Sequence, residues 1–64
     1  MIQQPELGRK IADYRKARGL TQEELALKCN LDVRTLQRIE SAQVMPRAYN
    51  VKLIFEALGI EYEN

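Results

Sequence analysis

Hydrophobic side chains recur along this chain at intervals of three and four residues, which is the period of an amphipathic α-helix. Pro5 suits the first position of a helix, and Gly19 suits the left-handed position that follows one. The pattern therefore predicts a first helix that opens at Pro5 and stops before Gly19. Its buried face is expected to carry Leu7, Ile11, Tyr14 and, less strongly, Ala17.

The start of a second helix at Thr21 is the clearest local signal in the chain. Thr21 and Glu24 fit a capping box, in which the side chain of each accepts a hydrogen bond from the backbone N–H of the other. Leu20 and Leu25 are spaced to form a hydrophobic staple across this start. Asn30 tolerates a left-handed backbone and is expected to end the helix.

A third helix is predicted from Val33 to Glu40, with Asp32 as its N-cap. Leu36 and Ile39 lie three residues apart and are expected to point into the core. The rest of the helix is expected to be largely solvated. These solvated positions are Val33, Arg34, Thr35, Gln37 and Arg38.

A loop over residues 41–45 and a fourth helix that begins at Pro46 complete the pattern. Gly59 and Ile60 resemble a Schellman ending. The core positions of this helix follow the i, i+3, i+4, i+7 spacing at Val51, Ile54, Phe55 and Leu58.

The predicted fold is all-α and compact, with four helices and a fifth as an alternative. We expect one domain over residues 1–64, with a core at about 6–60 and a tail at 61–64.

The second and third predicted helices meet the requirements of a helix-turn-helix together. Small Ala26 lies where the two helices would cross, and Asn30 occupies the tight turn. Leu36 and Ile39 hold the second of the two helices on the core. This combination is much more specific than any one of its parts.

The stretch RKARGLTQEELA, residues 15–26, resembles the opening of the Cro/lambda-repressor-like (XRE) helix-turn-helix family. The resemblance continues through Leu36, Ile39-Glu40, Pro46 and residues 57–60, and covers roughly residues 7–60. It implies a lambda-repressor-like fold and binding to double-stranded DNA, with the third helix in the major groove.

The resemblance also implies roles for individual residues. Gln22 would contact a DNA phosphate, and Arg15 would pair with Glu40. The expected phosphate-contacting set is Gln22, Arg15, Ser41 and Gln43. The expected base-contacting set is Val33, Arg34, Thr35, Gln37 and Arg38. The residues that hold the helix-turn-helix together would be Ala26, Asn30, Leu36, Ile39 and Glu40.

The chemistry of the exposed side chains on the third predicted helix agrees with these implied base contacts. Arg34 and Arg38 are four residues apart, so they share one helix face. An arginine that binds guanine through two hydrogen bonds contributes about 1–3 kcal/mol of discrimination, and Gln37 could serve adenine in the same way. Val33 or the methyl group of Thr35 could contact a thymine methyl.

Two positions depart from the family pattern. Asn30 replaces the commoner glycine of the turn, which is a mild change. Ala42 stands where glycine often follows the Ile-Glu pair, and a left-handed alanine costs about 1 kcal/mol or more. We therefore expect the loop that carries Ser41 and Gln43 to differ from that of the family.

Composition excludes several function classes. The chain has no His and a single Cys, Cys29, so histidine catalysis, a His-containing metal site and an internal disulfide are ruled out. We expect Cys29 to be a core residue. Apolar runs are too short to span a membrane. No enzymatic activity, metal or cofactor is indicated, and the expected location is the cytoplasm.

The net charge of +1 hides an uneven distribution. Residues 1–38 hold eight Lys and Arg against five Asp and Glu, whereas residues 39–64 hold two against four. The predicted DNA-facing helices lie in the positive part, which is compatible with one DNA-binding face.

The sequence thus predicts a transcriptional regulator, in the first place a repressor, that binds double-stranded DNA as a homodimer. The candidate dimer positions are Leu53, Ile60, Tyr62 and the 42–46 loop. Two alternatives stay open: an antitoxin that binds both operator and toxin, and a helix-turn-helix module that binds an unknown protein partner without DNA.

Overall fold

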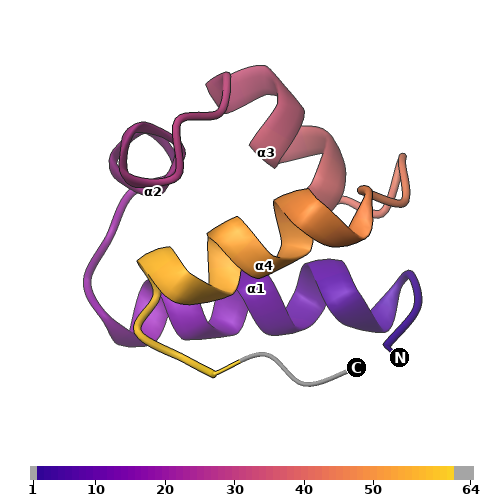
Figure 1. Cartoon of the computed structure of the whole chain (residues 1–64), viewed down its shortest axis with the longest axis horizontal. Helices are drawn as coiled ribbons and strands as arrows, with labels where there is room; N and C mark the ends of the chain where they lie inside the picture. Colours follow the sequence, from indigo (N-terminus) through magenta and orange to yellow (C-terminus); the bar gives the residue numbers. More distant parts are fainter. Residues whose placement is uncertain (1, 62–64) are drawn as a thin grey trace.

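The computed structural model describes residues 2–61 and contains four helices in that part of the chain, with no strand. They are α1 (Glu6–Ala17), α2 (Gln22–Lys28), α3 (Val33–Glu40) and α4 (Ala48–Ala57) (Figure 1). The all-α prediction is confirmed. The predicted dimer position Tyr62 lies outside the described residues, as does most of the predicted tail.

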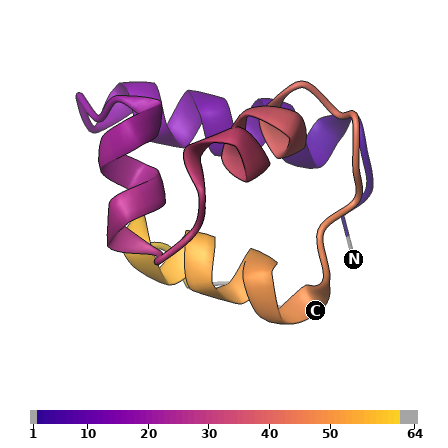
Figure 2. The same cartoon turned by 90° about the horizontal axis from the view of Figure 1, so that it is seen from above.

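The four helices enclose one hydrophobic core. Seen from above, α1 and α4 form opposite edges, α2 crosses between them at one end, and α3 lies in the middle (Figure 2). The predicted core positions are buried, apart from Tyr14, which is half-buried with its ring edge-to-face against Phe55, and Ala17, which is exposed. The buried apolar residues are Leu7, Ile11, Leu25, Ala26, Cys29, Leu36, Ile39, Val51, Ile54, Phe55 and Leu58.

The capping box at the start of α2 is confirmed. The N–H of Glu24 donates to the Thr21 hydroxyl at 3.0 Å, and the N–H of Thr21 donates to the Glu24 carboxylate at 2.8 Å. The hydrogen bond that the Thr21 N–H donates to the carboxylate is the main cause that lowers the pKa of Glu24, because it favours the ionised form.

Two other helix starts differ from the prediction. Helix α1 begins at Glu6, one residue after Pro5, which has the N-cap position. Helix α4 begins at Ala48 rather than Pro46, because Arg47 has an extended backbone (ψ 153°) that cannot continue a helix. Asp32 has the N-cap position of α3, but its side chain makes no capping hydrogen bond.

All four helices end in the same way, with a left-handed residue and two closing hydrogen bonds that form a Schellman motif. At the end of α3, the N–H of Ala42 donates to the Ile39 carbonyl at 3.1 Å, and the N–H of Gln43 donates to the Arg38 carbonyl at 2.9 Å. The left-handed residues are Gly19, Asn30, Ala42 and Gly59, with φ of 69°, 57°, 63° and 76°. Ala42 therefore adopts this conformation despite its Cβ.

Helix α1 packs against the end of α3 at Gly8. A Cβ added to Gly8 would collide with the backbone carbonyl oxygen of Ile39 and would lie 2.8 Å from that of Glu40. The two backbones can approach this closely only because residue 8 has no side chain.

The first prediction concerns this contact. In an ordinary helix, Gly→Ala stabilises by about 0.5–1 kcal/mol. Gly8→Ala should instead lower the free energy of unfolding by about 1–3 kcal/mol, because backbone carbonyls cannot move aside as a side chain does. Urea denaturation measures the change. Lys10→Ala, exposed on the same helix, is the control and should stay within about 0.5 kcal/mol of the unsubstituted protein. A more stable Gly8→Ala variant would contradict the tight contact.

The second prediction concerns Ala42. Glycine has no steric penalty at φ 63°, so Ala42→Gly should raise the free energy of unfolding by about 0.5–1 kcal/mol after its own entropy cost is subtracted. The matched control is Ala12→Gly inside α1, which should lower it by about 0.5–1 kcal/mol. Thermal denaturation of the two variants should therefore give shifts of opposite sign; shifts of the same sign would contradict the left-handed assignment.

Candidate nucleic-acid interface

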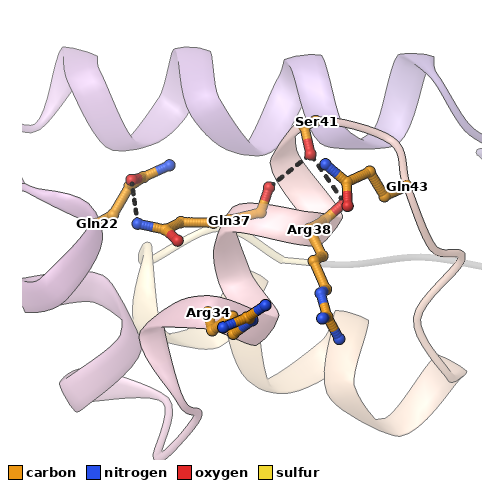
Figure 3. A pocket seen from close by; sticks show the side chains of 6 residues that line it. All are labelled: Gln22, Arg34, Gln37, Arg38, Ser41 and Gln43. Carbon is orange, nitrogen blue, oxygen red and sulfur yellow. Dashed lines mark hydrogen bonds between the residues drawn. The ribbon is translucent and has the colours of Figure 1, made fainter.

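An open groove of about 640 Å³ runs along the exposed side of α3. Its walls come from the start of α2, from α3 and from the loop that follows α3 (Figure 3). Six side chains line it: Gln22, Arg34, Gln37, Arg38, Ser41 and Gln43. All six belong to the contact sets that the sequence predicts, and no acidic residue is among them.

Arg34 and Arg38 supply the charge of the groove. Both are exposed and lie one turn apart on α3, and the side chain of Arg38 extends away from α1 (Figure 3). Within the described part of the chain, neither arginine has a carboxylate within 4.0 Å. The ion pair found there joins Arg15 to Glu40. Their charges are therefore available to an anionic ligand.

The side chain of Gln22 has a fixed orientation. Its Nε2 donates to Glu40 Oε1 at 3.0 Å, and its Oε1 accepts a longer hydrogen bond, 3.4 Å, from Gln37 Nε2 (Figure 3). The amide nitrogen has a second hydrogen that these two bonds do not use. Gln22 therefore links α3 to the start of α2 and has one N–H donor that can bind a further acceptor.

The predicted pairing of Arg15 with Glu40 is confirmed. Arg15 Nε and Nη2 donate to the two carboxylate oxygens of Glu40 at 2.8 Å and 3.0 Å. Arg15 Nη1 donates to the carbonyl of Leu20 at 2.9 Å, and only 10% of the Arg15 side chain is exposed. Arg15 thus acts inside the domain, where Glu40 and the Leu20 carbonyl occupy its three guanidinium nitrogens rather than a DNA phosphate.

The loop after α3 is held from two sides. Ser41 Oγ donates to the Gln37 carbonyl at 2.9 Å, at the start of the loop. Gln4 Nε2 donates to the carbonyls of Ile39 at 2.9 Å and Val44 at 2.7 Å. Gln4 Oε1 in turn accepts from the N–H of Gly8 at 2.8 Å.

Sequence analysis missed Gln4, because no pattern along the chain indicates a side chain that bonds to a segment 35 or 40 residues away. Gly8 did offer a signal, since a glycine inside a helical pattern often marks a close backbone approach.

Val33 and Thr35 differ from the expectation of a largely solvated position. Both are half-buried, and Val33 packs against the hydrophobic core. Neither lines the groove. For Val33 the cause is its apolar side chain, which is stabilised by packing against the core and leaving water. Less of each side chain is therefore free for contact with a base.

Cys29 is a core residue, as predicted. The residue is 4% exposed, and its thiol donates to the carbonyl of Leu25 at 3.1 Å. Burial raises the pKa of this thiol, because the low-dielectric surroundings disfavour the thiolate.

The described residues hold neither a candidate metal site nor a candidate membrane span. No group of three or more His, Cys, Asp and Glu residues there could hold a metal ion. None of the helices in residues 2–61 is long and apolar enough to cross a membrane.

Helices α2 and α3, joined by residues 29–32, have the arrangement of a helix-turn-helix protein. Over residues 11–63, most of the chain, the sequence matches the family model HTH_3, described as Helix-turn-helix. The chain therefore belongs to the Cro/C1-type (XRE) helix-turn-helix family, whose domains are DNA-binding regulators rather than enzymes. No curated protein matches the chain.

The third prediction concerns the Glu40 carboxylate. Glu40→Gln leaves the Arg15 guanidinium buried without a counter-charge, so the free energy of unfolding should fall by about 3 kcal/mol. The matched control is Glu23→Gln, an exposed position that should change it by less than about 0.5 kcal/mol. Urea denaturation measures both.

A double variant tests the cause of that loss. Arg15→Met with Glu40→Leu removes both charges, so it should lose less stability than Glu40→Gln alone. A Glu40→Gln variant as stable as the Glu23→Gln control would contradict the importance of the pair.

Proposed function

We propose that this domain is a transcriptional repressor that binds double-stranded DNA sequence-specifically, with α3 in the major groove. The observation that supports this most directly is the composition of the groove on α3. It gathers four neutral polar side chains and two arginines that have no ion-pair partner within residues 2–61, from three consecutive segments and with no acid among the lining residues. A strongly negative polymer whose edges offer donors and acceptors is the ligand that fits such a surface.

The proposed roles follow from where each side chain lies. Arg34, Gln37 and Arg38 read base edges, because they are exposed on the face of α3 that borders the groove. Val33 and Thr35 add apolar contact through the parts that remain accessible. The proposed phosphate-contacting residues are Gln22, Ser41 and Gln43.

Gln22 is suited to a phosphate because Glu40 fixes the direction of its amide. The carboxylate can only accept, so the nitrogen and not the oxygen of the amide faces it. The second amide hydrogen then points to a partner that accepts, and a phosphate oxygen is one.

The proposed binding unit is a homodimer on two half-sites about one helical turn apart, because one α3 alone buries little surface. Repression follows from occupation of the operator, which other proteins then cannot enter. The free, buried thiol of Cys29 is compatible with the reducing cytoplasm, where we place this activity.

Selection from random double-stranded oligonucleotides at low salt tests the proposal. We expect a two-fold symmetric consensus and an affinity that falls steeply as salt rises, since bound phosphates release counterions. Failure to enrich any sequence at low salt would overturn the proposed DNA binding. Capture of a protein partner in that case would favour the module that binds protein alone, and capture together with an enriched operator would favour an antitoxin.

The fourth prediction separates base reading from general attraction. Arg34→Ala or Arg38→Ala should lower the preference for the selected sequence over random DNA by about 1–3 kcal/mol, because a contact to two guanine atoms is lost. The control is Arg9→Ala, an exposed arginine on α1 outside the groove. It should weaken selected and random DNA equally. A loss of preference as large in Arg9→Ala would contradict the assignment of α3.

A further inference from the structure

A second groove, of about 450 Å³, lies between the end of α2 and α4. One wall carries Lys28 and Asn30, and the wall on α4 carries Tyr49, Leu53 and Glu56. It shares no lining residue with the groove on α3. The DNA contacts proposed above therefore leave it unoccupied.

This groove presents apolar surface to solvent. Tyr49 is 70% exposed, although a tyrosine that packs fully buries about 150–250 Å². Leu53 beside it is half-buried and packs against the core from the outer side of α4. A large exposed aromatic next to an aliphatic side chain is typical of a protein contact surface.

The two walls carry opposite charges. Lys28 lies on the α2 wall and Glu56 on the α4 wall, and neither forms an ion pair within 4.0 Å in residues 2–61. A surface with one positive and one negative wall is complementary to itself, because a two-fold axis brings each wall against the other wall of a second copy. Charge complementarity therefore selects a second copy of this chain as the occupant.

We infer that this groove is the contact surface of a two-fold homodimer, in which Lys28 faces the partner's Glu56 and Tyr49 packs against the partner's Leu53. The inference rests on the proposed function only for the dimer's role on DNA. It assigns the dimer contact to α2 and α4. Of the residues in this contact, the sequence analysis named only Leu53 as a candidate dimer position.

The position of α4 supports this contact. Figures 2 and 3 look onto the side of α3 that carries the first groove, with α1 along one edge and α4 along the other. A two-fold axis beside α4, parallel to the viewing direction, would join two copies along α4. Both α3 helices would then face the same side, as binding to one DNA duplex requires.

The size of the surface predicts a weak dimer. A standard interface buries about 800 Å² on each partner, which would be about a fifth of the 4249 Å² that this chain exposes. The groove covers only parts of two short helices. Dimerisation is therefore expected mainly at high protein concentration, or on DNA, where two half-sites hold the copies close together.

Charge reversal with mixing tests the contact. Lys28→Glu alone and Glu56→Lys alone each place like charges across the two-fold axis, so self-association should weaken about ten-fold. An equimolar mixture of the two variants should recover it, because the mixed dimer has an opposite pair at both ends. Sedimentation equilibrium at up to millimolar protein, without DNA, measures this, so the outcome does not depend on DNA binding.

Two further variants complete the test. Tyr49→Ala should weaken self-association about ten-fold or more, since it removes the central apolar contact. Lys10→Glu, a charge reversal on α1 at the opposite edge, is the matched control and should leave it unchanged. On DNA, the Tyr49 variant should keep its affinity for a single half-site and lose the added affinity for two.

Three results would overturn the inference. They are no self-association of the unsubstituted chain at millimolar concentration, no recovery in the mixture, and a Tyr49→Ala variant that associates as before. Self-association with the expected pattern but without DNA binding would contradict the proposed function and support the dimer surface. DNA binding without that pattern of self-association would support the proposed function and contradict the dimer surface.

Discussion

The Glu40 carboxylate is the point on which the arrangement of three helices depends. It lies at the end of α3 and accepts hydrogen bonds from two nitrogens of Arg15 on α1 and from the amide of Gln22 at the start of α2. A charge this far from water is tolerated only when it is paired and hydrogen-bonded. Because this buried carboxylate must be hydrogen-bonded, its partners on α1 and at the start of α2 are held next to the end of α3.

This constraint sets the geometry of the groove on α3. Gln22 can take its position there because Glu40 holds the amide, and Glu40 is held in turn by Arg15. Gly8 and Gln4 hold the loop side of the groove, where the backbone of α1 meets the end of α3 and the following loop. The exposed side chains of α3 therefore project from a helix whose C-terminal end is held by buried or hydrogen-bonded groups, which is what a recognition helix needs.

Local rules explain what the sequence alone could predict. The start of α2 at Thr21 and the left-handed turn at Asn30 depend on neighbouring residues, so their chemistry is visible in the chain. The half-burial of Val33 and the bonds of Gln4 depend on segments far away in the sequence, and no periodicity encodes them. The Arg15–Glu40 pair came from the family resemblance, because two charges 25 residues apart carry no signal of contact by themselves.

Ala42 shows how local cost and tertiary structure are balanced near the proposed phosphate contacts. The sequence indicated that a left-handed alanine is unfavourable, yet the structure has it at φ 63°. The conformation persists because the N–H of Gln43 closes the helix end and Gln4 holds the carbonyl of Val44. The surrounding hydrogen bonds thus determine the backbone conformation at a position where the intrinsic preference of alanine is for negative φ. In the proposed complex, Ser41 and Gln43 would meet DNA already ordered, so binding would not bear the entropy cost of arranging this loop.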